Sequence, residues 1–243
     1  MTGLLALKQA NERRWANAKL LKPGMFTSVA KHLVAPDAKS RYQAVSYQTG
    51  VPWCVIAVIH ERECSQDWTG SPAQGDPWNR VSVHVPAGRG PFRSWEEAAI
   101  DALVNCAPYA ARNRDWSIGG ALTILEEYNG LGYASRGRPS PYIWSGTDQY
   151  ISGKYVRDGV YDPDAVDSQL GCAGLLLAMM PLDPTITFTG VTITTANPAP
   201  TIPSPRTPNA AKTLPPSITN PSKGSIGAFI ASILSAIFNS RRK

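Results

Sequence analysis

Two carboxyl groups, 13 residues apart, are the first feature of this sequence that could do chemistry. Glu63 ends the stretch PWCVIAVIHERE, which is apolar for two helical turns, and it follows Ile59 by four residues. That spacing places Glu63 near the buried face of a helix, where loss of water raises the pKa of a carboxyl group. Asp76 follows in the stretch AQGDPWN. A carboxyl group that keeps its proton near neutral pH is what a glycosidase uses as its general acid.

The second carboxyl group suggests a geometry for the pair. A helix that ends in Glu63 and is followed by a hairpin bearing Asp76 can place two carboxyl groups across a cleft. An inverting glycosidase holds its pair about 6.5–9.5 Å apart, so that a water molecule fits between them. Glu61 lies about 200° around the helix from Glu63, so its side chain is expected in solvent. Asp76 also has a plainer interpretation as a turn residue, because Asp-Pro after glycine is ordinary turn chemistry.

These groups would be positioned by a body that is mainly helical. Apolar periodicity and helix signals predict helices over residues 4–20, 25–35, 38–49, 52–66, 95–107, 116–128 and 163–179. Asp37 and Ser94 are expected as N-caps, and Pro52 and Pro163 in the first turns of their helices.

A small β-hairpin is expected between the helices, in residues 69–92. Glycine and proline punctuate this stretch, and Val81, Val83 and Val85 alternate with polar residues in its middle. Alternation with a period of two is typical of a strand. The predicted fold class is therefore α+β, mainly α.

Composition divides the chain into three parts. Residues 1–180 are the predicted catalytic domain, with its core in 40–180. Residues 181–223 are rich in Pro, Thr and Ser and are expected to form an extended linker. Residues 224–243 predict a basic amphipathic helix about 20 Å long, too short to cross a bilayer core of about 30 Å. It could lie on an anionic membrane surface, pack on another protein or fold back on its own domain.

Charge and motifs exclude several classes of partner and cofactor. The formal net charge is +6 and the sequence pI is about 9.2, which suits a polyanionic partner. Nucleic acid is not expected, because the chain has no basic run before its tail, no zinc-finger spacing and no RRM motif. No cofactor or metal is expected either, since there is no GxGxxG after a strand, no Walker A motif, no HExxH and no EF-hand loop.

The cysteines and the N-terminus indicate where the chain is made. None of the four cysteines forms a CxxC pair, and Cys54 and Cys64 would lie about 15 Å apart on one helix, so buried free thiols are expected. No secretory signal is seen at the N-terminus, and there is no apolar run of about 20 residues. Synthesis in the cytoplasm is the expectation.

Three stretches carry a resemblance to a known group. The sequence IHERECSQDWTGSPAQGDPWNRVSVHVPAGRGPFRSWEEAAIDAL resembles bacterial and phage lysozyme-family proteins with an IHxxE helix, a GDP turn and a VPxGRGP segment. These proteins are similar to goose-type lysozymes and lytic transglycosylases. The stretches LEEYNGLGY at 125–133 and SPYIWSGTDQYISGKYVRDG at 140–159 also match. The resemblance spans roughly residues 40–180, and the order of the motifs makes it more specific than any one of them.

The resemblance implies a lysozyme-like fold and a muramidase, as in an endolysin or a bacterial lysozyme. Such an enzyme hydrolyses the β-1,4 bond between N-acetylmuramic acid and N-acetylglucosamine in peptidoglycan. Glu63 would protonate the glycosidic oxygen, and Asp76 would position or activate water. The enzyme is expected to act on the cell wall, outside the cytoplasm, and to be a monomer. It would associate with a membrane if residues 224–243 bind one.

Further residues are implied in sugar binding. His60 would line the cleft, although a hydrogen-bonded structural histidine is an equally open interpretation. Tyr128 and Asn129 would bind the sugar or its N-acetyl group, or form only a helix C-cap with Gly130. The aromatic candidates for stacking on sugar rings are Trp78, Tyr142, Trp144 and Tyr150.

Two alternatives stay open at this point. A lytic transglycosylase uses one glutamate, makes a 1,6-anhydro product and needs no aspartate partner, but the Glu-Ser usual in that class is Glu63-Cys64 here. A protein of another class would only bind the wall or a membrane, without catalysis.

Overall fold

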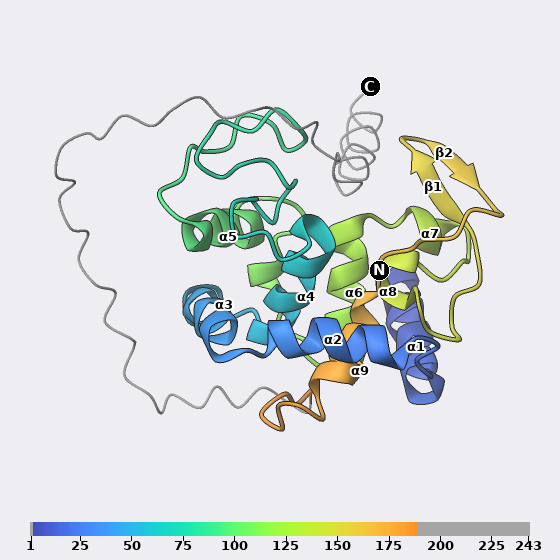
Figure 1. The fold of residues 1–243 in the computed structure, drawn as a ribbon. Helices are drawn as coiled ribbons and strands as arrows, with labels where there is room; N and C mark the ends of the chain where they lie inside the picture. The colour runs from blue at the N-terminus through green and yellow to red at the C-terminus, as the bar shows by residue number, and fades with distance from the viewer. Residues whose placement is uncertain (1, 189–243) are drawn as a thin grey trace, which may run out of the picture.

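The helix that carries Glu63 is enclosed by the rest of the protein. In the computed structural model, which describes residues 2–188, helix α4 spans Trp53–Cys64, and residues 54–60 are all buried. A helix that is apolar all round packs on every side. α3 lies against α4 and α5, α2 crosses α9, and α1 lies along α6 (Figure 1).

The remaining elements are short and mostly helical. The other helices are α1 Thr2–Asn17, α2 Pro23–Leu33, α3 Pro36–Thr49, α5 Trp95–Val104, the 3-10 turn η1 Ala110–Arg112, α6 Ile118–Asn129, α7 Gly132–Ser135, α8 Pro141–Trp144 and α9 Cys172–Met179. Strands β1 Lys154–Arg157 and β2 Val160–Asp162 pair antiparallel. The predicted class, mainly α with a small antiparallel sheet, is confirmed for the described residues.

Close packing between helices explains one glycine. A Cβ atom at Gly174 in α9 would lie 2.3 Å from the ring of Phe26 in α2, which is shorter than any contact between carbon atoms. Glycine therefore lets α2 and α9 approach each other, and Phe26 is fully buried between them.

Helix boundaries follow the predicted signals in part. Ser94 caps α5 as predicted, because its hydroxyl accepts from the backbone N–H of Glu97. The prediction for Asp37 was wrong by two positions, since Ala35 is the N-cap and Asp37 lies in the first turn. Pro52 is the N-cap of α4 rather than a residue of its first turn. In both places the proline already fixes the backbone that enters the helix.

The predicted helix over residues 163–179 forms only in its second half, because α9 begins at Cys172. Pro163 therefore opens no helix. Asp167, in the irregular first half, is buried and receives side-chain hydrogen bonds from Arg62 and Lys154. These tertiary contacts hold the segment in a non-helical path.

The hairpin was predicted in the wrong place. Residues 81–85 form no strand, and the structure places the antiparallel pair at 154–162. Val81, Val83 and Val85 are all exposed, so their alternation does not mark a buried face. The segment is shaped instead by side-chain hydrogen bonds to the backbone, which compete with strand pairing.

The body of the protein extends beyond the predicted domain end at residue 180. Ile186 is buried, the rings of Phe188 and Trp15 lie 6.1 Å apart, and Lys39 pairs with Asp183. Residues 181–188 thus belong to the packed body, not to the predicted linker. The rest of that linker and the predicted helix over 224–243 lie outside the described residues.

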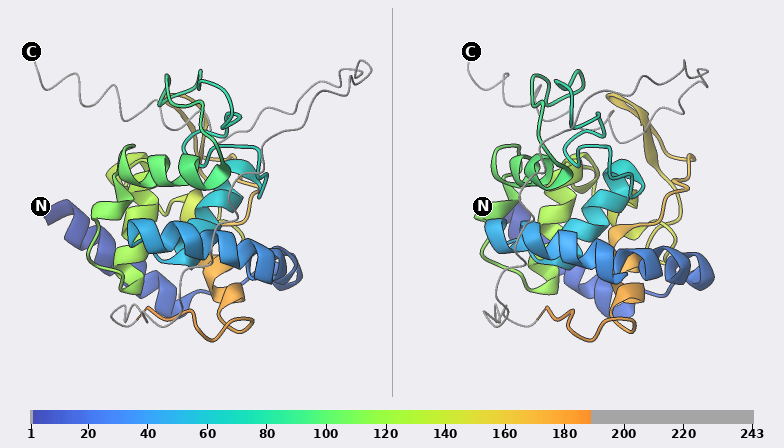
Figure 2. Two further views of the ribbon diagram at one scale, coloured as in Figure 1. Left: turned by 90° about the vertical axis from the view of Figure 1, so that its left-hand side faces the viewer. Right: turned by 60° about the vertical axis from the view of Figure 1, so that its left-hand side comes forward.

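A long loop and the β-hairpin lie at one end of the helical body. Both views in Figure 2 place the loop over residues 65–94 and the β1–β2 hairpin at the same end, where α4 and α6 finish. Between residues 2 and 188, no helix combines the length and the apolar content needed to cross a membrane.

Candidate active site

The Glu63 carboxyl group lies in the protein interior at the end of α4. The residue is 7% exposed, and the Tyr142 hydroxyl donates a hydrogen bond of 2.9 Å to its Oε1 atom. Burial raises the pKa of Glu63 to about 7, although the Tyr142 hydrogen bond and the charge of Arg62 both act to lower it. Near neutral pH this group is divided between its acid and its carboxylate forms, as a general acid requires.

Local sequence fixes the position of this carboxyl group. Helix α4 stops because Ser65 and Gln66 take the left-handed conformation, with φ of 51° and 62°. The chain then turns into the 65–94 loop. The short helix α8, opened by Pro141, brings the Tyr142 hydroxyl within hydrogen-bond distance of Glu63.

Helix α6 contributes the next neighbours. Tyr128 is partly buried and donates to the Pro72 carbonyl at 2.9 Å, which ties the loop to α6. Burial raises the pKa of Tyr128, and the charge of Glu63 raises it further, so the two groups are close enough to interact. Asn129 is 4% exposed, and its Nδ2 atom has no hydrogen-bond partner among the described residues. The charge of Glu63 thus acts on Tyr128, while the predicted role of Tyr128 and Asn129 in sugar binding stays a prediction.

Asp76 is occupied by its own loop. One carboxylate oxygen accepts from the backbone N–H groups of Val83 at 2.8 Å and His84 at 3.0 Å, and the other lies 2.6 Å from His84 Nδ1. Desolvation alone would raise the pKa of Asp76, but the hydrogen bonds from His84 and Val83 lower it overall. Asp76 is therefore an ionised residue that shapes the loop, which matches the plainer of its two interpretations.

His60 does not line a cleft. It is fully buried, with Nε2 3.1 Å from the Asp67 carbonyl and Nδ1 2.9 Å from the Tyr42 hydroxyl. The carbonyl can only accept, so Nε2 carries the proton and Nδ1 accepts from Tyr42. Burial lowers the pKa of His60 to about 4, and the rings of Trp68 and Trp95 pack against it. The expectation of a sugar contact is corrected, because both ring nitrogens bind protein.

The aromatic candidates for sugar stacking separate into two groups. Trp144 is 0% exposed, and Tyr150 is buried with its hydroxyl 3.2 Å from the Gly153 carbonyl, so neither ring offers a face to a ligand. Tyr142 is also buried, and its hydroxyl donates a hydrogen bond to Glu63. Trp78 keeps a partly exposed ring, while its Nε1 donates to the Trp68 carbonyl at 2.8 Å.

Sequence reasoning missed the charged group next to Glu63. Arg62 is 5% exposed and its NH2 nitrogen lies 2.9 Å from Asp167 Oδ2. The signal was present, because Arg62 follows Val58 and Ile59 by four and three residues and so falls on the buried face of α4. A buried arginine needs a carboxylate partner. The partner itself lies 105 residues away, so its identity is not a local property of the sequence.

Glu61 and Cys64 complete the end of α4. Glu61 was expected in solvent but is half-buried, and it accepts from the Gln66 side chain at 2.7 Å. The Cys64 thiol donates to the Ser71 carbonyl at 3.3 Å. All four cysteines are free thiols, as predicted, but only Cys54, Cys106 and Cys172 are buried, and Cys64 is partly exposed.

A second buried glutamate shows that a raised pKa alone does not define the site. Burial raises the pKa of Glu126 to about 7, and its Oε2 accepts from the Asn11 amide at 3.4 Å. Glu126 lies two residues before Tyr128 on α6, about 200° around the helix, where it faces α1. What distinguishes Glu63 is its set of neighbours.

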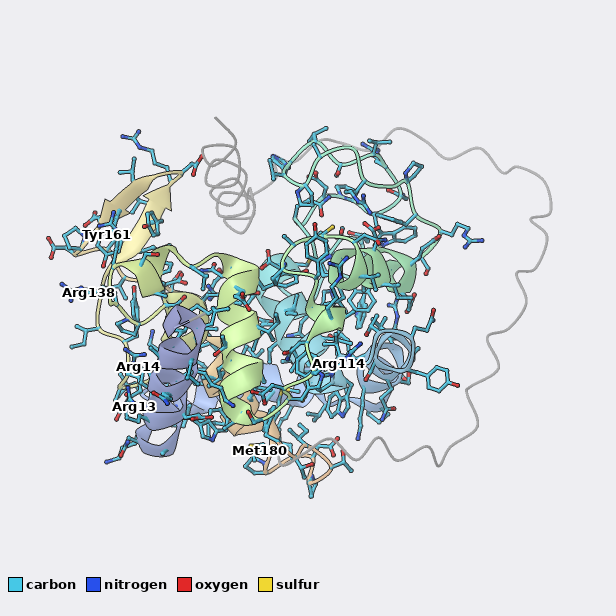
Figure 3. The ribbon with its side chains drawn as sticks, turned by 180° about the vertical axis from the view of Figure 1, so that it is seen from behind. Arg13, Arg14, Arg114, Arg138, Tyr161 and Met180 are labelled. Carbon is cyan, nitrogen blue, oxygen red and sulfur yellow. The ribbon has the colours of Figure 1, made fainter. Side chains whose placement is uncertain are left out.

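The positive charge of the chain does not reside in its folded body. All 18 acidic residues lie in 1–188, whereas six of the 24 lysines and arginines follow residue 188, so 1–188 is formally neutral and 189–243 carries +6. Arg13, Arg14 and Arg138 lie along the side where α1 and the hairpin residue Tyr161 are found, away from the 65–94 loop (Figure 3). A metal site was not expected from the sequence. Within the described part of the chain, no cluster of His, Cys, Asp and Glu could hold a metal ion.

Comparisons with known proteins give no relative. The chain matches no family model, no curated protein and no solved structure. The lysozyme-family resemblance therefore rests on the short motifs, and any activity must be argued from the residues around Glu63.

Proposed function

We propose that this protein is a muramidase that cleaves the β-1,4 bond between N-acetylmuramic acid and N-acetylglucosamine in peptidoglycan. The observation that carries the proposal is the Glu63 carboxyl group, which is buried, hydrogen-bonded by Tyr142 and raised in pKa to about 7. Glycosidases need such a carboxylic acid to protonate the departing sugar oxygen.

The reaction begins with the neutral form of Glu63. Its proton passes to the glycosidic oxygen, the bond from that oxygen to the sugar carbon breaks, and positive charge develops on the sugar ring. Glu63 becomes a carboxylate, which the Tyr142 hydroxyl and the positive charge of Arg62 stabilise. A water molecule then adds to the sugar carbon and gives one proton to the Glu63 carboxylate, which completes hydrolysis and restores the acid.

Substrate binding is assigned to the end of α6. Asn129 holds a buried Nδ2 donor without a partner in the described residues, directly after Tyr128. A buried donor without a partner destabilises the free protein, and an acceptor supplied by a ligand removes that penalty. The carbonyl oxygen of an N-acetyl group is such an acceptor, and Trp78 offers a partly exposed ring to a sugar face.

One observation favours a second candidate, a lytic transglycosylase. Both carboxylate oxygens of Asp76 are held by Val83 and His84, so this aspartate is not available to activate a water molecule. A transglycosylase needs no such aspartate, because a hydroxyl of the sugar itself attacks and forms the 1,6-anhydro product. The mass of the released muropeptides separates the two: hydrolysis adds water to the product, and transglycosylation does not.

The experiment that tests catalysis compares two buried glutamates. Wild type, Glu63→Gln and Glu126→Gln are assayed by clearing of purified peptidoglycan and by a zymogram. Loss of a general acid reduces rates by about 100-fold or more, so Glu63→Gln should lose nearly all clearing. Glu126→Gln is the matched control, with a similarly buried carboxyl group on another face, and should keep activity within about threefold. Equal clearing by wild type and Glu63→Gln would show that Glu63 is not the acid, whereas absence of clearing by the wild type would favour the non-catalytic binding protein.

A further inference from the structure

A buried ion pair stands directly behind the Glu63 site. Arg62 donates from NH2 to Asp167 Oδ2 at 2.9 Å and from NH1 to the Leu170 carbonyl at 3.3 Å. Both Arg62 and Asp167 are 5% exposed. Arg62 precedes Glu63 in α4, so this contact ties the residue beside the proposed acid to the segment before α9.

The ion pair reaches the β1–β2 hairpin through a second cation. Lys154, the first residue of β1, donates to Asp167 Oδ1 at 2.9 Å. The backbone of Asp167 is fixed as well, because its N–H donates to the Tyr150 hydroxyl and its carbonyl accepts from the Ser145 hydroxyl at 2.9 Å. The anion between the two cations is therefore rigidly placed.

The same arginine covers the ring that serves Glu63. Its guanidinium carbon lies 4.7 Å from the centroid of the Tyr142 ring, in a cation–π contact. Tyr142 in turn donates to Glu63 Oε1 at 2.9 Å. The Tyr142 side chain is thus held between Arg62 on its face and Glu63 at its hydroxyl end.

Stability alone is a weak reason for this arrangement. Removing charges from water costs several kcal/mol per ion, and buried ion pairs are often replaceable by apolar residues without loss of stability. The Nε atom of Arg62 is also buried without a partner among the described residues, which adds a further penalty. Arg62 is the cation whose charge acts on Glu63, so it stabilises the carboxylate formed after proton transfer.

We propose that Arg62, held by Asp167 and through it by Lys154 of the hairpin, is a positioning residue for Glu63: it fixes Tyr142 against the carboxyl group and stabilises the carboxylate left after proton transfer. This inference deepens the proposed function and rests on Glu63 as the acid. The charge of Glu63 also acts on titratable groups of α4, α6, α8 and α9, among them Cys64, Tyr128, Tyr142 and Cys172.

The test measures the titration of Glu63 in two independent ways, in the full chain. The first is the pH dependence of kcat/KM on soluble glycan fragments, whose alkaline limb follows loss of the Glu63 proton. The second is carbon-13 NMR of labelled glutamate carboxyl groups, with the Glu63 signal assigned from Glu63→Gln. The variants are Arg62→Gln, Arg62→Lys and Lys154→Gln, and Lys39→Gln removes a remote ion pair with Asp183 as the control.

The expected shifts follow from the sign of the charge removed. Loss of a nearby positive charge destabilises the carboxylate, so Arg62→Gln should raise the pKa of Glu63 and move the alkaline limb to higher pH by about half a unit or more. Lys154→Gln should act in the same direction but less, because Lys154 contacts the other oxygen of Asp167. Arg62→Lys keeps the positive charge, so the alkaline limb of kcat/KM should lie where it does in the wild type. Its kcat should stay several-fold below that of the wild type, because the flat guanidinium over Tyr142 is lost.

Each outcome decides for or against the inference. If Arg62→Gln and Lys154→Gln lower the melting temperature while the limb and the NMR titration stay unmoved, as for Lys39→Gln, the ion pair is only structural. If Arg62→Gln does not fold, Lys154→Gln, which leaves the interior of α4 intact, decides the question by the same shift. Absence of cleavage by the wild type overturns the proposed function, and the NMR titration then still tests whether Arg62 stabilises the carboxylate.

Discussion

The end of α4 and the 65–94 loop carry carboxyl groups 13 residues apart that behave in opposite ways. Glu63 is enclosed by helices, and burial raises its pKa to about 7. Asp76 lies in an irregular loop, where the backbone N–H groups of Val83 and His84 surround it and lower its pKa. The difference shows that the balance between burial, which raises the pKa of a carboxyl group, and hydrogen-bond donors, which lower it, decides which group keeps a proton.

The largest loss of stability should come from removing the loop carboxylate. Asp76→Ala deletes a charged acceptor that holds residues 83 and 84, and hydrogen bonds to charged groups contribute about 1.5–3 kcal/mol. We expect the free energy of unfolding to fall by about 3 kcal/mol in urea titrations, with faster proteolysis between residues 76 and 92. Asp76→Asn, which keeps an acceptor oxygen, should lose less. A variant that resists protease like the wild type yet clears no peptidoglycan would give Asp76 a catalytic role and break the comparison.

The buried carboxyl group should make stability depend on pH in a defined window. The folded pKa of Glu63, about 7, lies above the ordinary value of 4.5 for a glutamate, so the folded state binds its proton more tightly. The stability that protonated Glu63 contributes to the fold is fully present below about pH 4.5 and is lost as pH rises through about 7. Glu63→Gln should therefore match wild type at pH 4.5 and be more stable at pH 8, by roughly 1.4 kcal/mol for each pH unit that separates the folded and unfolded pKa values. A constant difference between the two proteins from pH 4.5 to 8 would contradict the raised pKa.

A smaller effect is expected at the donor to Glu63. Tyr142→Phe removes one hydroxyl that stabilises the carboxylate, so the pKa of Glu63 should rise further and the alkaline limb of the cleavage rate should move to higher pH. The cleavage rate should fall several-fold and stability by about 1 kcal/mol, the usual contribution of one hydrogen bond. Thr123→Val is the control, since the Thr123 hydroxyl is buried in α6, donates to the Gly119 carbonyl at 2.7 Å and should leave the limb in place when it is removed.

The smallest effect should follow Cys64→Ser, which creates the Glu-Ser pair of transglycosylases. The thiol donates to the Ser71 carbonyl, and a hydroxyl can make the same bond. We expect a stability change within about 0.5 kcal/mol and unchanged product masses. A switch between hydrolytic and anhydro products in this variant would show that residue 64 selects the reaction.

The chain itself determined the helix at Glu63 and the cap at Ser94, because each depends on neighbouring residues. Periodicity placed Glu63 on a buried face, and the structure has it 7% exposed. The same reasoning could not place the hairpin, because the alternation of valines in the sequence is the same whether their side chains are buried on a sheet or exposed to solvent. Val83 is 77% exposed.

Only the tertiary structure decided which groups meet. Asp167 reaches Arg62 across 105 residues, and Tyr142 reaches Glu63 across 79. It also decided that His60 and Trp144, both plausible ligands of a sugar, lie wholly inside the core. A sequence pattern states that a face is apolar or that a charge needs a partner, but the partner is selected by the packing of helices that are distant along the chain.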